Sequence, residues 1–101
     1  MSYAKGRRFE WNVRDLLEAR GWVVFRAARS KPVDLIAMKN GQALLIECKY
    51  DSPMTKDRKR LLLELAERAG AKPILAKKRR YERRLKLIDL RDGGELSLEE
   101  L

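Results

Sequence analysis

The spacing of apolar residues divides the chain into helical and strand-like segments. In residues 6–20 the apolar positions recur at i, i+4, i+7 and i+8, as Phe9, Val13, Leu16 and Leu17. That period is typical of an amphipathic helix, and Gly21 stands where helices commonly end. A second helical pattern begins at Thr55, a residue that caps helices well, and ends at Gly70. We therefore expect helices over 6–20 and 55–70.

Five short segments that are rich in aliphatic and β-branched residues predict strands, and they cover residues 22–27, 33–38, 43–50, 72–78 and 84–90. Asn40–Gly41 is a strong signal for a two-residue hairpin turn between the second and third of them. The order αβββαββ predicts an α/β fold with a mixed five-stranded sheet flanked by helices. A chain of 101 residues fits a single domain, residues 1–101. In the tail, Ser97 and Glu100 have capping-box spacing.

The third predicted strand contains charged residues among apolar ones. Glu47 and Lys49 are two positions apart, so they share one face of the strand. If Asn40–Gly41 forms a two-residue turn, Asp34 pairs directly opposite Glu47, with Cβ atoms about 5 Å apart. The pattern therefore predicts that an Asp, a Glu and a Lys converge at one point of the sheet.

Two neighbouring carboxylates repel each other unless a cation lies between them. An oxygen-preferring divalent ion such as Mg²⁺ fits this pair, because it is commonly bound by one or two carboxylates, water and phosphate oxygens. Lys49 would then face a substrate or an attacking water. The alternative is an ordinary cross-strand ion pair on a solvated sheet face. The combination of three such residues in otherwise apolar strands favours the site.

The amino-acid composition limits which partners the chain can bind and which catalytic groups it can use. The chain has 24 Lys+Arg against 15 Asp+Glu, a formal charge of +9, which favours a polyanionic partner: nucleic acid first, an anionic membrane surface second. The absence of histidine excludes His-based general base catalysis and imidazole zinc sites. The single Cys48 excludes an intrachain disulfide. No apolar run approaches a membrane span, so we expect no membrane association and a cytoplasmic location.

Pro32-Val33-Asp34 and Glu47-Cys48-Lys49 together resemble the PD-(D/E)xK nuclease motif. Residues 5–30 resemble the opening of the archaeal-type Holliday-junction resolvases, with Lys5-Gly6 and Phe9-Glu10 on the first helix and a serine before the aspartate. The likeness covers about residues 5–90. One departure is Val33, which separates the proline from the aspartate, whereas the family usually places the two side by side.

The resemblance implies roles for individual residues. It implies a catalytic set of Glu10, Ser30, Asp34, Glu47 and Lys49. Asp34 and Glu47 would bind Mg²⁺, or Mn²⁺ in its place, with Glu10 assisting directly or through water and the carbonyl of Cys48 completing the ligand set. Lys49 would orient the hydrolytic water, and Ser30 and Arg26 would contact the DNA backbone. From the sequence alone, Glu10 reads as a solvated helix residue.

The segment 77–86 is strongly basic, with seven Lys or Arg residues, one acid and Tyr81. Between two strands it should project as a hairpin that contacts phosphates. The predicted DNA-binding residues are Lys5, Arg7, Arg8, Arg26, Arg29, Ser30, Lys31, Lys78, Arg79, Arg80 and Tyr81. No base-reading motif is present, so we expect recognition through backbone and shape.

Taken together, these features predict a Mg²⁺-dependent, structure-selective endonuclease that resolves four-way junctions in branched double-stranded DNA, without a small-molecule cofactor. The family resemblance implies a homodimer, because two symmetric cuts require two sites. Two alternatives remain open: another PD-(D/E)xK nuclease acting on flaps, nicks or foreign DNA, and a non-catalytic basic module that binds nucleic acid. The expected location is the cytoplasm, or the host cytoplasm if the gene is viral.

Overall fold

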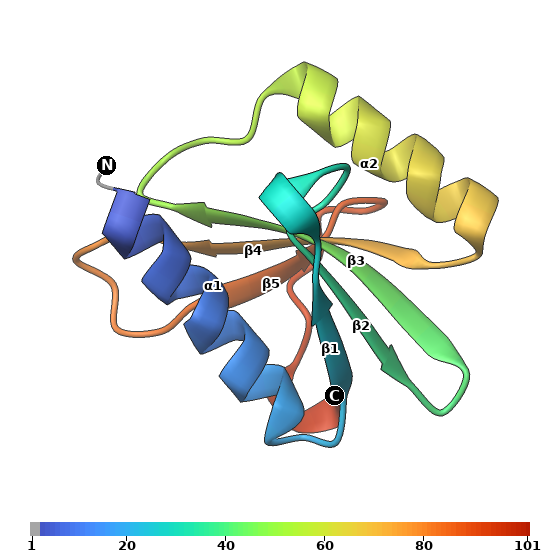
Figure 1. Cartoon of the computed structure of the whole chain (residues 1–101), viewed down its shortest axis with the longest axis horizontal. Coiled ribbons are helices and arrows are strands. Elements are labelled where there is room, and N and C mark those ends of the chain that lie inside the picture. Colours follow the sequence, from blue (N-terminus) through green and yellow to red (C-terminus); the bar gives the residue numbers. More distant parts are fainter. Residues whose placement is uncertain (1–2) are drawn as a thin grey trace.

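The computed structural model describes residues 3–101, without the side chains of residues 3, 4 and 30. The helices are α1 (Tyr3–Glu18) and α2 (Lys56–Ala69), with the 3₁₀ turns η1 (Ala28–Ser30) and η2 (Leu98–Glu100). The strands are β1 (Val23–Arg26), β2 (Leu35–Lys39), β3 (Gln42–Tyr50), β4 (Lys72–Lys78) and β5 (Lys86–Asp89). The predicted order αβββαββ is confirmed (Figure 1).

The strands form one mixed sheet in the order β1-β2-β3-β4-β5. Neighbouring strands are antiparallel except β3 and β4, which are parallel because α2 crosses over between them. Thr55 caps the start of α2 by accepting a hydrogen bond from the Arg58 N–H, and Gly70 ends the helix in the left-handed conformation. The predicted five-stranded α/β architecture is therefore confirmed.

The β2–β3 hairpin has the predicted register. Lys39 pairs with Gln42 and Leu35 with Ile46, so Asn40 and Gly41 form the turn. Both turn residues have positive φ, 49° and 80°, as a type I′ turn requires. The strand predicted over 33–38 begins two residues later, however, at Leu35. Asp34 immediately precedes the strand, and its N–H donates to the Ile46 carbonyl at 3.1 Å.

The two faces of the sheet bury two apolar clusters, because alternate residues of β3 point to opposite sides. Leu44 and Ile46 belong to the larger cluster, in which Phe9, Val13 and Leu17 of α1 also take part. Leu45 packs on the other face against a smaller cluster that contains Val33, Leu62 of α2 and Leu90. Figure 1 shows α1 and α2 on either side of the sheet. The two helices thus pack against opposite faces of the sheet, and both contact β3.

Other boundaries differ from the sequence prediction. Helix α1 spans Tyr3–Glu18 rather than 6–20, because its first turn is too polar to show the apolar period. The last strand is confined to Lys86–Asp89, where Asp89 accepts the Arg91 N–H and starts a turn. The Ser97 side chain makes no capping hydrogen bond, which corrects the capping-box prediction. The tail instead bridges the β5 edge, with Glu95 opposite Ile88. In residues 3–101, no helix has the length and apolar content needed to span a membrane.

Candidate active site

The candidate site lies where β2 and β3 stop pairing. The last β2–β3 pair is Leu35 with Ile46, yet β3 continues to Tyr50 and stays hydrogen-bonded to β4. Residues 47–50 are therefore open on the side where β2 would have continued. Here a cavity of about 460 Å³ contains four of the five predicted catalytic residues. Its lining consists of Gly6, Glu10, Arg29, Lys31, Asp34, Glu47, Cys48, Lys49, Tyr50, Thr55 and Arg58.

Asp34 is held by the backbone of the neighbouring strand. Its carboxylate accepts a 2.7 Å hydrogen bond from the Cys48 N–H, and the residue is only 6% exposed. A buried carboxylate needs such a donor, because an unpaired charge in this position would be strongly destabilising. Asp34 is thus joined to β3 twice, through this side-chain bond and through its own N–H, which donates to the Ile46 carbonyl.

Glu47 lies between two cations. Its carboxylate is 3.2 Å from Arg58 Nε, which reaches over from α2, and 3.8 Å from Lys49 Nζ. Its side chain is 6% exposed. Burial, together with the nearby negative charge of Asp34, raises the pKa of the Glu47 carboxyl, and Arg58 and Lys49 oppose that rise. The predicted proximity of Glu47, Lys49 and Asp34 is thus present in the structure.

Glu10 enters the cavity from α1. Arg26 at the end of β1 donates from Nε to Glu10 at 3.1 Å. Burial raises the pKa of the Glu10 carboxyl most, the Arg26 hydrogen bond lowers it, and Asp34 raises it further. Glu10 is therefore partly buried, and the charge of Asp34 raises the pKa of its carboxyl. It is not the solvated helix residue that its sequence position suggested.

These residues fit a divalent cation by the chemistry of their donors. Three carboxylates, from Glu10, Asp34 and Glu47, face one cavity, and hard oxygen ligands of this kind suit Mg²⁺ or Mn²⁺. Burial and the three carboxylates raise the pKa of the Cys48 thiol, which leaves its carbonyl as the better ligand. Within residues 3–101, no three acidic or cysteine side chains form a ready-made metal cluster. Two of the three carboxylates instead form ion pairs, Glu10 with Arg26 and Glu47 with Arg58.

The remaining predicted residues fall into three groups. Arg29 and Lys31 line the cavity, and Arg7 lowers the pKa of Glu10 through its charge. Lys78 lies 5.6 Å from the centre of the Tyr50 ring, and Arg79 begins the β4–β5 loop. Lys5, Arg8, Arg80 and Tyr81 are exposed outside the cavity. The side chain of Ser30 lies outside the described part of the structure, so its predicted role stays a prediction.

The sequence prediction missed Arg58. A signal was present, because Arg58, Leu62 and Ala66 follow one another at intervals of four residues. Leu62 and Ala66 are buried against the sheet, so Arg58 lies on the same inner face of α2. A charged residue that continues an apolar helical stripe is a reason to look for a buried carboxylate beneath it.

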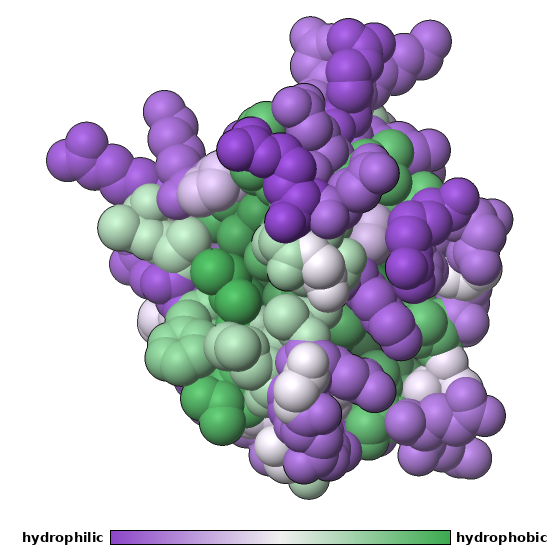
Figure 2. Space-filling model, turned by 90° about the vertical axis from the view of Figure 1, so that its right-hand side faces the viewer, coloured by the Kyte–Doolittle hydropathy of each residue, from purple (hydrophilic) through white to green (hydrophobic). Residues whose placement is uncertain are grey.

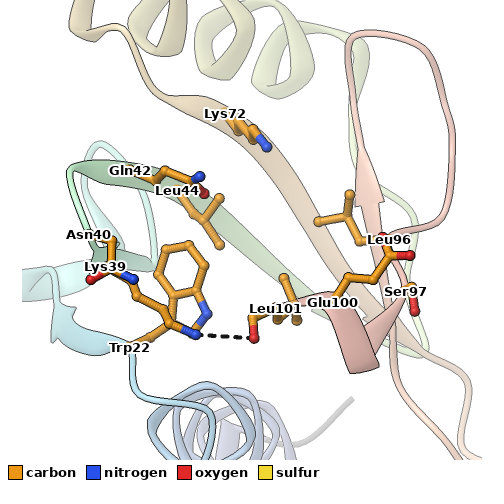
Figure 3. A pocket seen from close by; sticks show the side chains of 10 residues that line it. All are labelled: Trp22, Lys39, Asn40, Gln42, Leu44, Lys72, Leu96, Ser97, Glu100 and Leu101. Carbon is orange, nitrogen blue, oxygen red and sulfur yellow. Dashed lines mark hydrogen bonds between the residues drawn. The ribbon is translucent and has the colours of Figure 1, made fainter.

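A second cavity, of about 270 Å³, lies at the other end of β3 (Figure 3). Trp22, Lys39 and the terminal Leu101 border it, and Lys39 Nζ donates to the Leu101 carbonyl at 3.2 Å. Glu100 is the only acidic residue in its lining. A lone carboxylate does not provide the paired acids that phosphodiester chemistry needs, so this cavity is not the candidate active site.

Comparisons with known proteins agree with this geometry. The model of the archaeal Holliday junction resolvase family (Hjc) matches residues 1–96. The chain is 42% identical over 78 residues to the crossover junction endodeoxyribonuclease Hjc of Methanocaldococcus jannaschii, which covers 73% of this chain and 59% of that protein. The solved structure of Archaeoglobus fulgidus Hjc, a Holliday junction resolvase, superposes with a TM-score of 0.75 at 24% identity. That match covers 86% of this chain and 74% of the other.

Proposed function

The chain belongs to the archaeal Holliday junction resolvase family, and on that basis we propose that it is a metal-dependent endonuclease that cuts four-way DNA junctions. It spans 59% of the length of the M. jannaschii relative, so the activity is proposed for this chain rather than transferred. Such an enzyme acts in DNA recombination and repair, and its substrate would place it in the cytoplasm.

One observation carries the proposal: Glu10, Asp34 and the Glu47–Lys49 pair come from three separate segments of the chain and line one cavity. An acid on α1, an acid before β2 and an acid–lysine pair on β3 have little reason to meet in a purely structural cluster. Gathering three carboxylates costs free energy, and a cation with a bound phosphate would recover it. A non-catalytic DNA-binding module would not need this arrangement.

The reaction is hydrolysis of a phosphodiester. A water molecule attacks phosphorus, the bond to the 3′ oxygen breaks, and the products are a 5′-phosphate and a 3′-hydroxyl. Lys49 is 30% exposed and lies 3.8 Å from Glu47, so its ammonium group faces both the carboxylate and the cavity. We assign it to orienting the water and to offsetting negative charge that develops on the phosphate.

A divalent cation in the cavity would supply charge neutralisation for the phosphate and lower the pKa of water. Asp34 and Glu47 are the proposed ligands, with Glu10 assisting and the Cys48 carbonyl as a fourth donor. Mg²⁺ is the proposed ion, and Mn²⁺ should replace it because both prefer oxygen ligands.

The basic residues around the cavity support DNA as the partner. Arg29 and Lys31 line the cavity, and the exposed Arg80 and Tyr81 extend from the β4–β5 loop. Tyr81 is 79% exposed, which leaves its ring free to contact sugar or base edges. Phosphate contacts of this kind give affinity without reading sequence, as a junction-selective enzyme requires.

We also propose that the enzyme works as a homodimer. Val23, Phe25 and Met38 are 57%, 52% and 48% exposed and lie on neighbouring positions of β1 and β2. β1 is an edge strand of the sheet. Figure 2 shows hydrophobic surface bordered by hydrophilic side chains on the side that carries α2 and the β2–β3 hairpin. A second copy would cover this face and supply the second active site.

The decisive assay compares a synthetic four-way junction with a matched linear duplex and a flap, each with and without Mg²⁺. We expect metal-dependent cutting of the junction, paired on opposite strands, and much slower cutting of the other two substrates. Equal cutting of all three would support a general nuclease instead. Junction binding without any cutting would point to a non-catalytic binding module.

Asp34→Asn separates catalysis from folding. The asparagine keeps an oxygen that can accept the Cys48 N–H, so circular dichroism and thermal unfolding should change little. Cutting should fall by several orders of magnitude, whereas junction binding in metal-free buffer should persist or strengthen, because a negative charge near phosphate is removed. Loss of binding and folding together would indicate a structural role for Asp34.

A further inference from the structure

Beside the active site lies a further cleft, of about 300 Å³, on the α2 side of the sheet and distinct from the two cavities described above. Its charged lining consists of Lys49, Asp51, Lys59, Lys77, Lys78 and Arg79. Lys49 also lines the active-site cavity, so the two hollows are neighbours that share this residue. The first turns of α2 separate them elsewhere, with Arg58 on one side and Lys59 on the other.

Most cations of this cleft have no carboxylate partner among the described residues; Lys49 is the exception, since it lies 3.8 Å from Glu47. In the part of the chain that the structure describes, Lys59, Lys77 and Arg79 form no ion pair with a carboxylate. The parallel register also places Lys49 beside Lys77 on adjacent strands. Neighbouring like charges in a sheet are destabilising unless an anion offsets them. Among the described lining residues Asp51 is the only acid, and one carboxylate cannot neutralise the four cations other than Lys49.

The floor of the cleft is apolar. Met54, Leu75 and Leu90 contribute to it, and all three belong to the apolar packing on the α2 face of the sheet. A cationic rim above an apolar floor fits one unit of a DNA backbone, because the phosphate faces the rim while the sugar carbons rest on the floor. A free inorganic anion would make no use of that floor.

We propose that this cleft binds the nucleotide next to the scissile phosphate, with Lys59 and Lys77 as its phosphate contacts. This inference rests on the proposed function, since it requires a phosphodiester in the adjacent cavity. The cleaved strand then runs from the active site past Lys49 into the cleft. Lys49 contacts the phosphate under attack, and Lys59 and Lys77 fix the next one, which sets the position of the cut along the strand.

The test neutralises single phosphates of a four-way junction by methylphosphonate substitution on either side of the cut. Binding is measured in metal-free buffer. For the unaltered protein, one neighbouring substitution should weaken binding about eightfold at 0.1 M salt, the contribution of one released counterion. For Lys59→Met/Lys77→Met the same substitution should have no further effect, because the partner charges are already gone. In the double variant the slope of log affinity against log salt should also fall by about 0.9, because the two lysines contact one phosphate.

Lys56→Met and Lys72→Met are matched controls. Lys56 is exposed on the same helix as Lys59, Lys72 begins the same strand as Lys77, and neither lines the active site or the cleft. Both controls should keep the sensitivity of the unaltered protein. The single variant Lys59→Met repeats the test at an exposed helix position, where folding is not at stake.

The outcomes separate the two proposals. Suppose that the unaltered protein cuts the junction, but each neighbouring methylphosphonate weakens binding of Lys59→Met/Lys77→Met as much as binding of the unaltered protein. The proposed nucleotide site is then wrong, while the proposed nuclease activity is supported. If the junction is not cut in the presence of Mg²⁺, the proposed function fails, and this inference with it. Loss of the response in the lysine variants but not in the controls supports the site.

Discussion

Arg58 of α2 donates from Nε to the buried carboxylate of Glu47 at 3.2 Å, so a cation of the protein contacts an oxygen that a bound metal ion would need. The guanidinium offsets the charge of Glu47, as Lys49 does from 3.8 Å. A divalent ion that binds Glu47 must compete with Arg58 for the same oxygens. We therefore expect Arg58 to stabilise the metal-free protein and to lower its affinity for a metal ion.

Arg58→Met should tighten metal binding. It removes a positive charge beside the proposed metal site and keeps an apolar stem against the sheet. We expect the dissociation constant for Mn²⁺, measured by isothermal titration calorimetry, to fall by about tenfold. The experiment measures metal binding without DNA, so any contact of Arg58 with a DNA phosphate does not affect the result.

Arg60→Met is the matched control for this change. Arg60 lies two residues further along α2, is 79% exposed and pairs only with the exposed Asp57, at 3.9 Å. Removing its charge should leave Mn²⁺ affinity almost unchanged, because solvent screens it from Glu47. Weaker Mn²⁺ binding in Arg58→Met would show that Arg58 positions Glu47 for the ion rather than competing with it.

The order of the helices and strands, and the proximity of Asp34 to Glu47, could be predicted from local sequence. The Asn40–Gly41 turn specifies the β2–β3 register, and that register brings Asp34 close to Glu47. Local patterns could not predict that Asp34 leaves the strand to accept the Cys48 N–H. They also could not predict that Arg26 pairs with Glu10, because that contact depends on how α1 crosses the sheet. Side-chain pairs between distant elements depend on how those elements pack, and the spacing of residues along the chain does not predict that packing.

The Asp89–Arg91 pair should make stability depend on pH. Asp89 accepts hydrogen bonds from Arg91 Nε at 3.0 Å and Nη2 at 2.7 Å, and its side chain is 10% exposed. The Arg91 side-chain hydrogen bonds hold the pKa of the Asp89 carboxyl below its ordinary value. A carboxyl whose pKa is lower in the folded state stabilises the fold above its unfolded pKa of about 3.9, and that contribution disappears as pH falls through the folded pKa.

Asp89→Asn should therefore be less stable than the unaltered protein at pH 7, by about 1–2 kcal/mol, since Arg91 is half exposed and partly screened. The difference should shrink steadily below pH 4. Thermal unfolding followed by circular dichroism at several pH values measures it. Glu64→Gln, at an exposed position of α2, should show almost no difference at any pH. A gap between Asp89→Asn and the unaltered protein that stays constant down to pH 2 would contradict this account.

Phe25→Glu should separate the proposed dimer into monomers. Phe25 is 52% exposed on β1, next to Ile36 of β2 in the sheet register. A charge there costs little in a monomer, because the side chain already faces solvent, but it would be buried without a partner between two copies. We expect half the mass by light scattering after gel filtration, with unfolding temperature almost unchanged. Asn12→Glu places the same charge on an exposed position of α1 and should leave the mass unaltered.

The same variant tests whether dimerisation couples the two cuts. On a supercoiled plasmid that extrudes a cruciform, two cuts within one binding event give a linear product, whereas independent single cuts give a nicked circle first. The unaltered protein should produce linear plasmid directly, and Phe25→Glu should accumulate the nicked circle, because each monomer carries one active site. If Phe25→Glu remains dimeric and still yields linear plasmid, the apolar face of β1 and β2 is not the interface, and the second copy must dock elsewhere.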